Sequence, residues 1–108
     1  MTTPNTVLAQ AVCQWLDDHC LSVDELARAC AVEPRWVTEH VEAGLLAFEP
    51  DSPSGRWHFA SASLLRARRL AELERSFDAP PEIAALTADL IEEVQRLRAR
   101  LRALGLED

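Results

Sequence analysis

The feature that most constrains this chain of 108 residues is a long amphipathic segment near its carboxyl end. Between Pro81 and Gly105 there is no other Gly or Pro, and strong helix formers dominate. A single helix over residues 81–104 would be about 36 Å long. Its apolar residues repeat every seven positions, with Thr87 as an interruption, and this pattern indicates a coiled coil. The pattern does not decide between one helix and two. The repeating residues are Ile83, Leu90, Leu97 and Leu104, with Val94 and Leu101 at the second seam position.

Such a stripe must be covered, either by the chain's own domain or by a second chain. We favour a second copy, because the stripe is longer than so small a domain can cover. The sequence therefore predicts a homodimer. The predicted dimerisation residues are Leu90, Val94, Leu97, Leu101 and Leu104.

Residues 21–44 carry the pattern of two short helices joined by a tight turn, a helix-turn-helix. Ser22 and Glu25 have capping-box spacing. Pro34 suits the first position of a second helix, and Gly44 suits a left-handed end. The expected buried stripe of the first helix is Leu26, Ala27 and Cys30.

Two short apolar-aromatic runs flank "PDSPSG", which predicts a hairpin, or wing, packed through Leu46, Phe48, Trp57 and Phe59. We expect Ser61 or Ser63 to cap a following helix that ends near Ser76, and Asp78 to cap the last helix. The helix after the wing has an expected apolar face of Leu64, Leu65, Leu70, Leu73 and Phe77, and Arg66, Arg68, Arg69 and Arg75 lie mostly outside it.

Residues 7–16 can be interpreted in two ways. Leu8, Val12 and Leu16 follow helical spacing, whereas Val7, Ala9 and Ala11 alternate as in a strand. The pattern alone favours a helix. The whole chain then divides into an amino-terminal extension (1–20), a winged helix-turn-helix domain (21–77) and a carboxyl-terminal coiled-coil helix (78–108), and its fold class is mainly α.

The charge is unevenly distributed. The net charge is −7; residues 1–60 hold nine acidic residues and three Arg, and residues 61–108 hold nine and eight. Nucleic acid binding needs basic charge to displace counterions from phosphates, so an acidic first half argues against it. Such a surface suits a basic protein partner, although the charge can also serve solubility alone.

No catalytic arrangement or metal-ligand spacing is present, and we predict neither an enzyme nor a bound cofactor or metal. Cys13, Cys20 and Cys30 do not pair evenly and are expected to be buried free thiols, as in a reducing cytosol. No signal peptide and no membrane-spanning run is visible, which predicts a cytoplasmic protein without membrane contact.

The second helix carries the wrong charge for reading DNA. If Val37 and Val41 face the core, the opposite row contains Glu39 and Glu42, which would repel phosphates with no Arg or Lys beside them. An acidic helix of this kind can meet a basic protein, or its acids can simply be solvated. Charge alone selects as partner-binding residues Glu33, Glu39 and Glu42, with Asp24 and Glu25 behind them.

The order of helix, helix, wing, basic helix and long terminal helix resembles the MerR type of winged helix-turn-helix. More specifically, "LSVDELARACAVEPRWVTEHVEAGLL", "RWHF" and "APPEIAALTADLIEEV" resemble the CbpM chaperone-modulator family, over about residues 21–104. The resemblance implies binding to the J-domain of a DnaJ-like co-chaperone (CbpA type), which would block its stimulation of a DnaK-type chaperone. It also implies a strand within residues 7–16.

The alternative is a MerR-like DNA-binding transcription regulator. Such proteins share the winged domain, the basic helix and an antiparallel coiled-coil dimer. Arg66, Arg68 and Arg69 would then contact phosphates.

Overall fold

A computed structural model describes residues 20–50 and 56–106 of the chain. Residues 7–16 and most of the predicted wing loop lie outside this part, so the choice between helix and strand there stays open. The described elements, in chain order, are α2 (Val23–Cys30), α3 (Pro34–Glu42), β1 (Glu49–Pro50), β2 (Trp57–His58), α4 (Ser61–Phe77) and α5 (Pro81–Ala103).

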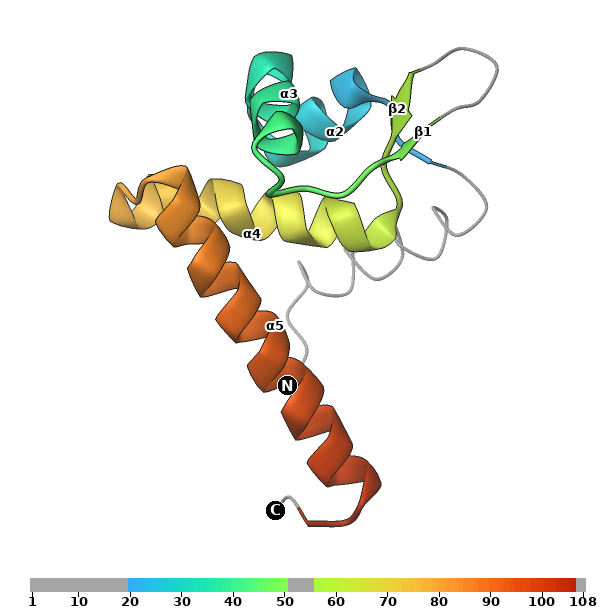
Figure 1. The fold of residues 1–108 in the computed structure, drawn as a ribbon, viewed down its shortest axis with the longest axis vertical. Helices are drawn as coiled ribbons and strands as arrows, with labels where there is room; N and C mark the ends of the chain where they lie inside the picture. Colours follow the sequence, from blue (N-terminus) through green and yellow to red (C-terminus); the bar gives the residue numbers. More distant parts are fainter. Residues whose placement is uncertain (1–19, 51–55, 107–108) are drawn as a thin grey trace.

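The helices form two layers and a projecting arm. Helices α2 and α3 lie together on one side of α4, and the β1–β2 hairpin stands beside them near the start of α4 (Figure 1). At the far end of α4 the chain turns sharply, and α5 runs away from the domain (Figure 1). This is the predicted mainly α, winged helix-turn-helix architecture with a long terminal helix.

The helix-turn-helix forms as its sequence signals predict. The Ser22 side chain accepts a hydrogen bond from the Glu25 backbone N–H, and the Glu25 side chain accepts one from the Ser22 N–H, so the capping box is confirmed. Pro34 begins α3. Gly44 has a φ of 79°, in the left-handed region where a residue without a Cβ is least strained. Both ends of the motif are therefore determined locally.

The wing is short, and the strand pair extends back toward α2. Strands β1 and β2 are antiparallel, and Glu49 pairs with His58. Just beyond β2, Phe59 exchanges two backbone hydrogen bonds with Leu21, at 2.9 and 2.8 Å. Phe59 and Leu46 are buried as predicted, whereas Phe48 is exposed and packs its ring 5.0 Å from that of Trp57.

Two predicted helix caps are wrong. The residue before α4 is Ala60, which has no capping side chain, so neither Ser61 nor Ser63 is the cap. The Ser63 hydroxyl instead donates to the Ala47 carbonyl at 2.7 Å and fastens α4 to the segment just before β1. Asp78 does not cap α5 either. It ends α4 in a left-handed conformation with φ 49°, and Pro80 precedes α5.

Residues 81–103 form one helix, and α5 has two distinct apolar faces. Ala84, Ala85 and Ala88 are buried and belong to the same core as α2, α3 and α4. Small side chains let α5 approach α4 closely. The heptad residues lie on another face and are exposed, so nothing in residues 20–50 and 56–106 covers them. They are Ile83 (53% exposed), Leu90 (60%), Val94 (45%), Leu97 (43%), Leu101 (41%) and Leu104 (65%).

The apolar face of α4 is only partly buried. Leu64 and Leu70 are in the core and Leu73 packs against it, but Leu65 and Phe77 are exposed. Phe77 lies at the turn into α5, where nothing in the described chain covers it. Within residues 20–50 and 56–106, no helix has both the length and the apolar character needed to cross a bilayer.

Candidate partner-binding surface

The orientation of α3 determines which side chains can meet a partner. Val37 and Val41 are buried, four residues apart on one side of the helix. Glu39 and Glu42 lie on the opposite side of the helix and are exposed, as the sequence predicted, and Glu33 is exposed just before the helix begins. The side of α3 equivalent to a DNA-reading surface therefore presents two carboxylates to solvent, with a third at the amino end of the helix.

One of these carboxylates has a basic neighbour, which corrects the expectation that Glu39 has none. Arg35 Nε lies 3.0 Å from Glu39 Oε1, one helical turn away. The two side chains are 81% and 61% exposed, and an exposed pair of this kind contributes little to stability. Arg35 nevertheless reduces the negative charge around Glu39, so Glu33 and Glu42 carry more of the acidic character of the surface.

The two acidic residues of α2 differ from each other. Glu25 is occupied by the capping box, and the hydrogen bond from the Ser22 backbone is the main cause that lowers the pKa of its carboxyl. Its role is structural. Asp24 is exposed and lines a cleft of about 570 Å³ with Trp57 and His58 of the wing. Glu33 and Glu39 line a different cleft, so no single cleft unites the five predicted residues.

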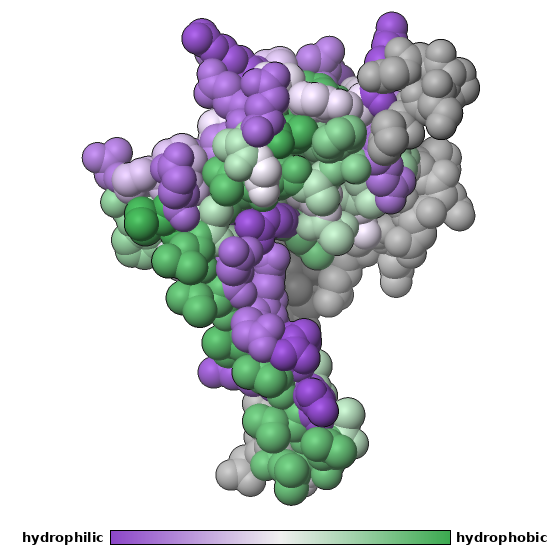
Figure 2. All heavy atoms as spheres, viewed as in Figure 1, coloured by the Kyte–Doolittle hydropathy of each residue, from purple (hydrophilic) through white to green (hydrophobic). Residues whose placement is uncertain are grey.

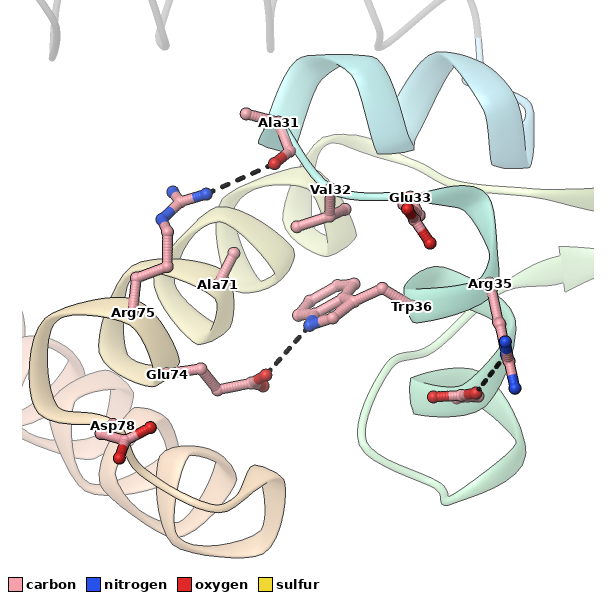
Figure 3. Close-up of a pocket in the computed structure, with 10 residues that line it drawn as sticks. Ala31, Val32, Glu33, Arg35, Trp36, Ala71, Glu74, Arg75 and Asp78 are labelled. Carbon is pink, nitrogen blue, oxygen red and sulfur yellow. Dashed lines mark hydrogen bonds and ion pairs between the residues drawn. The ribbon is translucent and has the colours of Figure 1, made fainter.

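The second cleft, of about 680 Å³, separates α3 from the end of α4. The Trp36 indole points across it, and its Nε1 donates to Glu74 Oε1 at 3.0 Å (Figure 3). On the opposite wall, Arg75 donates to the Ala31 carbonyl at 3.4 Å (Figure 3). These contacts hold the helix-turn-helix against α4.

A buried histidine completes this junction. His40 is 4% exposed and its ring stacks on that of Trp36 with centroids 3.7 Å apart. The sequence did not reveal the cluster of Trp36, His40 and Glu74. The four-residue spacing of Trp36 and His40 was available as a signal, but Glu74 is 34 positions from His40 along the chain.

Arg66 is also committed to structural contacts. It was predicted outside the apolar face of α4, yet its side chain is only 19% exposed. Its Nε donates to the Leu45 carbonyl at 2.7 Å, and its Nη1 lies 2.8 Å from Asp89 and 2.7 Å from Glu92 on α5. A guanidinium held by a carbonyl and two carboxylates is poorly placed to bind phosphate.

The cysteines do not all match the expectation of buried thiols. Cys30 is buried and free, and burial raises the pKa of its thiol to about 11. Cys20 is exposed, which contradicts the prediction for this residue, and Cys13 lies outside the described residues. Among residues 20–50 and 56–106, no three His, Cys, Asp or Glu side chains are grouped so that they could hold a metal ion.

Comparison with known sequences agrees with this architecture. The family described as "MerR HTH family regulatory protein" matches residues 21–105. A chaperone modulatory protein CbpM from Coxiella burnetii is 32% identical over 84 residues, which cover 78% of each chain. The chain belongs to the CbpM family. A CbpM from Pseudomonas putida is 34% identical over 83 residues, covering 73% of this chain and 77% of the relative.

A CbpM from Pseudomonas entomophila is 32% identical over 83 residues, covering 73% of this chain and 77% of the relative. No solved structure matches the chain. The CbpM relatives are named as chaperone modulators, and the wider family as regulatory proteins with a helix-turn-helix. This member of the CbpM family therefore combines a helix-turn-helix of the DNA-binding type with an acidic α3.

Proposed function

We propose that this chain is a chaperone modulator that binds the J-domain of a DnaJ-like co-chaperone of the CbpA type and inhibits it. Membership in the CbpM family supports this function. The observation that carries it is the exposure of Glu39 and Glu42 on the outer side of α3, with Glu33 exposed at the amino end of the helix. A J-domain uses a basic helix to engage its DnaK-type chaperone. An acidic α3 complements that helix.

Competition is the mechanism of the proposed inhibition. Complementary charges speed the encounter of two proteins and select the correct orientation. While the basic helix of the J-domain lies against α3, it cannot reach the DnaK-type chaperone. The co-chaperone then no longer stimulates ATP hydrolysis. Neither step requires catalysis by the modulator.

Charge reversal on α3 tests the proposal. In the double variant Glu39→Lys/Glu42→Lys, we expect binding to a J-domain to weaken by at least about tenfold, measured by calorimetry at two salt concentrations. Glu72→Lys is the matched control, because Glu72 is equally exposed but lies on α4. Circular dichroism establishes that both variants are folded. Unchanged binding of the double variant would place the contact elsewhere.

We further propose that the chain is a homodimer joined through α5. The exposed seam of Leu90, Val94, Leu97, Leu101 and Leu104 supports this, because one face of a helix with so many exposed apolar residues marks an interaction site. Leu97→Glu places a charge in the seam and is expected to give monomers in sedimentation. A variant that stays dimeric would show that the seam is wrong.

The family description as a regulatory protein favours a second function, DNA binding by a MerR-like transcription regulator. In that case the exposed Arg68 and the half-buried Arg69 would contact phosphates, whereas Arg66 is already engaged by α5. A gel-shift series on genomic fragments separates the two functions. A regulator loses affinity steeply as salt rises and prefers particular fragments, and we expect neither behaviour here.

A further inference from the structure

We infer that the elbow between α4 and α5 receives the carboxyl-terminal leucines of a second copy, Leu104 and Leu106. This inference rests on the proposed dimer and specifies how its two helices are aligned. It follows from three features of the described chain: an open apolar groove at the elbow, an ordered apolar cap at the other end of α5, and the separation of charge along that helix.

The elbow groove is apolar and open. It has a volume of about 260 Å³ and lies where α4 ends and α5 begins. Phe77 and Ile83, on its two sides, are 73% and 53% exposed. Leaving such side chains in water forgoes the free energy of burying them. Figure 2 shows that apolar residues continue from this elbow along α5. The groove is lined by Leu73, Phe77, Ala79, Ile83, Ala84 and Thr87.

The other end of α5 is an ordered apolar cap. Gly105 adopts φ 72°, its N–H donates to the Arg102 carbonyl at 3.0 Å, and the Leu106 N–H donates to the Leu101 carbonyl at 2.9 Å. This pair of bonds is a Schellman ending, which turns the chain back against the helix. Leu104 and Leu106 are held at its tip, 65% and 70% exposed. Figure 2 shows the apolar surface at this end of the molecule.

The charges of α5 indicate that the two helices run in opposite directions. The first half of α5 is acidic and the second half is basic, so parallel helices would place like charges together. Antiparallel helices place the acidic half of one copy against the basic half of the other. Arg66 of the same chain already binds two of these acids. The attraction therefore acts between the acidic half and the basic half as a whole, and not through particular ion pairs. The acids are Glu82, Asp89, Glu92 and Glu93, and the bases are Arg96, Arg98, Arg100 and Arg102.

The two seam positions face each other across an antiparallel pair, and two alignments bring the most seam residues together. One has its twofold axis at residue 92 and places Ile83 opposite Leu101 and Leu90 opposite Val94. The other has its axis between residues 95 and 96 and places Leu90 opposite Leu101 and Thr87 opposite Leu104. Both alignments bury the middle of the apolar stripe. They differ in which residues of the partner cover its two ends.

Only the alignment about residue 92 brings both carboxyl-terminal leucines to Phe77. It places residues 104 and 106 of one copy opposite residues 80 and 78 of the other, about 18 Å from the axis along the helix. Leu104 and Leu106 then reach the groove beside Phe77 and Ile83. The other alignment places these two leucines opposite residues 87 and 85, at the α5 side of the groove, and leaves Phe77 at its far side without either leucine. By twofold symmetry, each dimer has two such contacts.

Disulfide trapping in the full-length chain distinguishes the alignments. With Cys13, Cys20 and Cys30 replaced by Ala, the double variant Phe77→Cys/Leu106→Cys is expected to form a covalent dimer on mild oxidation. A bond within one chain is excluded, because α5 separates these positions by roughly 35 Å. Thr87→Cys/Leu104→Cys tests the other alignment and is expected to remain uncrosslinked. The reverse pattern, with dimers present in sedimentation, would overturn the inference while leaving the dimer proposal intact.

A second variant avoids oxidation. Leu106→Asp is expected to raise the dimer dissociation constant by at least about tenfold. Ala103→Asp is the control, since Ala103 is exposed at the same end of α5 but lies outside the seam. Equal effects of both substitutions would contradict the inference. A wild-type chain that is monomeric would remove both the inference and the dimer proposal, whereas J-domain binding is measured independently of either.

Discussion

His40 Nε2 lies 2.7 Å from Glu74 Oε2 and joins α3 to α4 inside the domain. The other ring nitrogen, Nδ1, is 2.7 Å from the Trp36 carbonyl, so both nitrogens face oxygen atoms. The second carboxylate oxygen of Glu74 accepts from Trp36 Nε1. One carboxylate on α4 thereby fixes two side chains of α3, and it determines how the acidic surface of α3 is presented.

Removal of this carboxylate should therefore destabilise the domain. In Glu74→Ala, the buried His40 and the indole of Trp36 both lose an acceptor, and unfolding should become easier by about 1–3 kcal/mol. Urea denaturation followed by circular dichroism measures the change. Glu72→Ala, an exposed glutamate on the same helix, is the control and should shift stability by less than about 0.5 kcal/mol. Equal shifts for the two variants would show that the cluster does not stabilise the junction.

Arg66 should prove structural, and its removal should loosen α5. Arg66→Ala leaves the Leu45 carbonyl and the carboxylates of Asp89 and Glu92 without this partner. We expect faster hydrogen exchange over residues 84–92 of α5 and a loss of about 1–3 kcal/mol in stability. Arg68→Ala, on the exposed side of α4, provides the comparison. If α5 exchanges at the same rate in both variants, the contact does not hold the helix.

Local signals allowed most of the fold to be predicted from the sequence. The capping box at Ser22, Pro34 at the start of α3 and Gly44 after its end each act within a few residues, so their effect is readable along the chain. The periodicity of 81–104 was equally local: it indicated helix and marked the apolar stripe, and the structure shows that these residues form one helix. The same periodicity could not show that Ala84, Ala85 and Ala88 form a second face against α4.

The candidate site was less predictable because its contacts join distant parts of the chain. Glu74 had no mark in the sequence that would pair it with His40, and Arg66 had none that would pair it with Glu92. The caps at Ser63 and Asp78 were predicted from residue type alone. The Ser63 hydroxyl donates to the Ala47 carbonyl, and Asp78 ends α4 in a left-handed conformation that Gly or Asn more often adopts. A long-range hydrogen bond therefore overrode the local preference at Ser63, whereas Asp78 is used to end one helix and not to cap the next.

The capping box gives a prediction for stability and its pH dependence. Ser22→Ala should destabilise the domain by about 1 kcal/mol, because α2 loses its side-chain cap. The box lowers the pKa of Glu25 in the folded state. Its contribution is therefore present above the pKa of the unfolded chain and is lost as the pH falls through the folded value. Glu25→Ala removes the carboxyl that titrates, so thermal unfolding at neutral and acidic pH should show wild type and this variant converging in acid. Ser22→Ala keeps the backbone N–H that Glu25 accepts from, and its difference from wild type should change less with pH. A constant difference between wild type and Glu25→Ala across that range would contradict this assignment.

The two described cysteines should differ sharply in reactivity. Cys30 is buried, and with a pKa of about 11 only roughly a thousandth of its thiol is ionised at pH 8, whereas Cys20 is exposed. In a Cys13→Ser background, a short pulse of iodoacetamide followed by mass spectrometry should modify Cys20 and spare Cys30 until urea unfolds the chain. Because folding raises the pKa of Cys30 above its usual 9.0, the unfolded chain ionises first, and stability should decline as the pH rises beyond that value. Equal labelling of both thiols in the native protein would mean that Cys30 is not buried in the core.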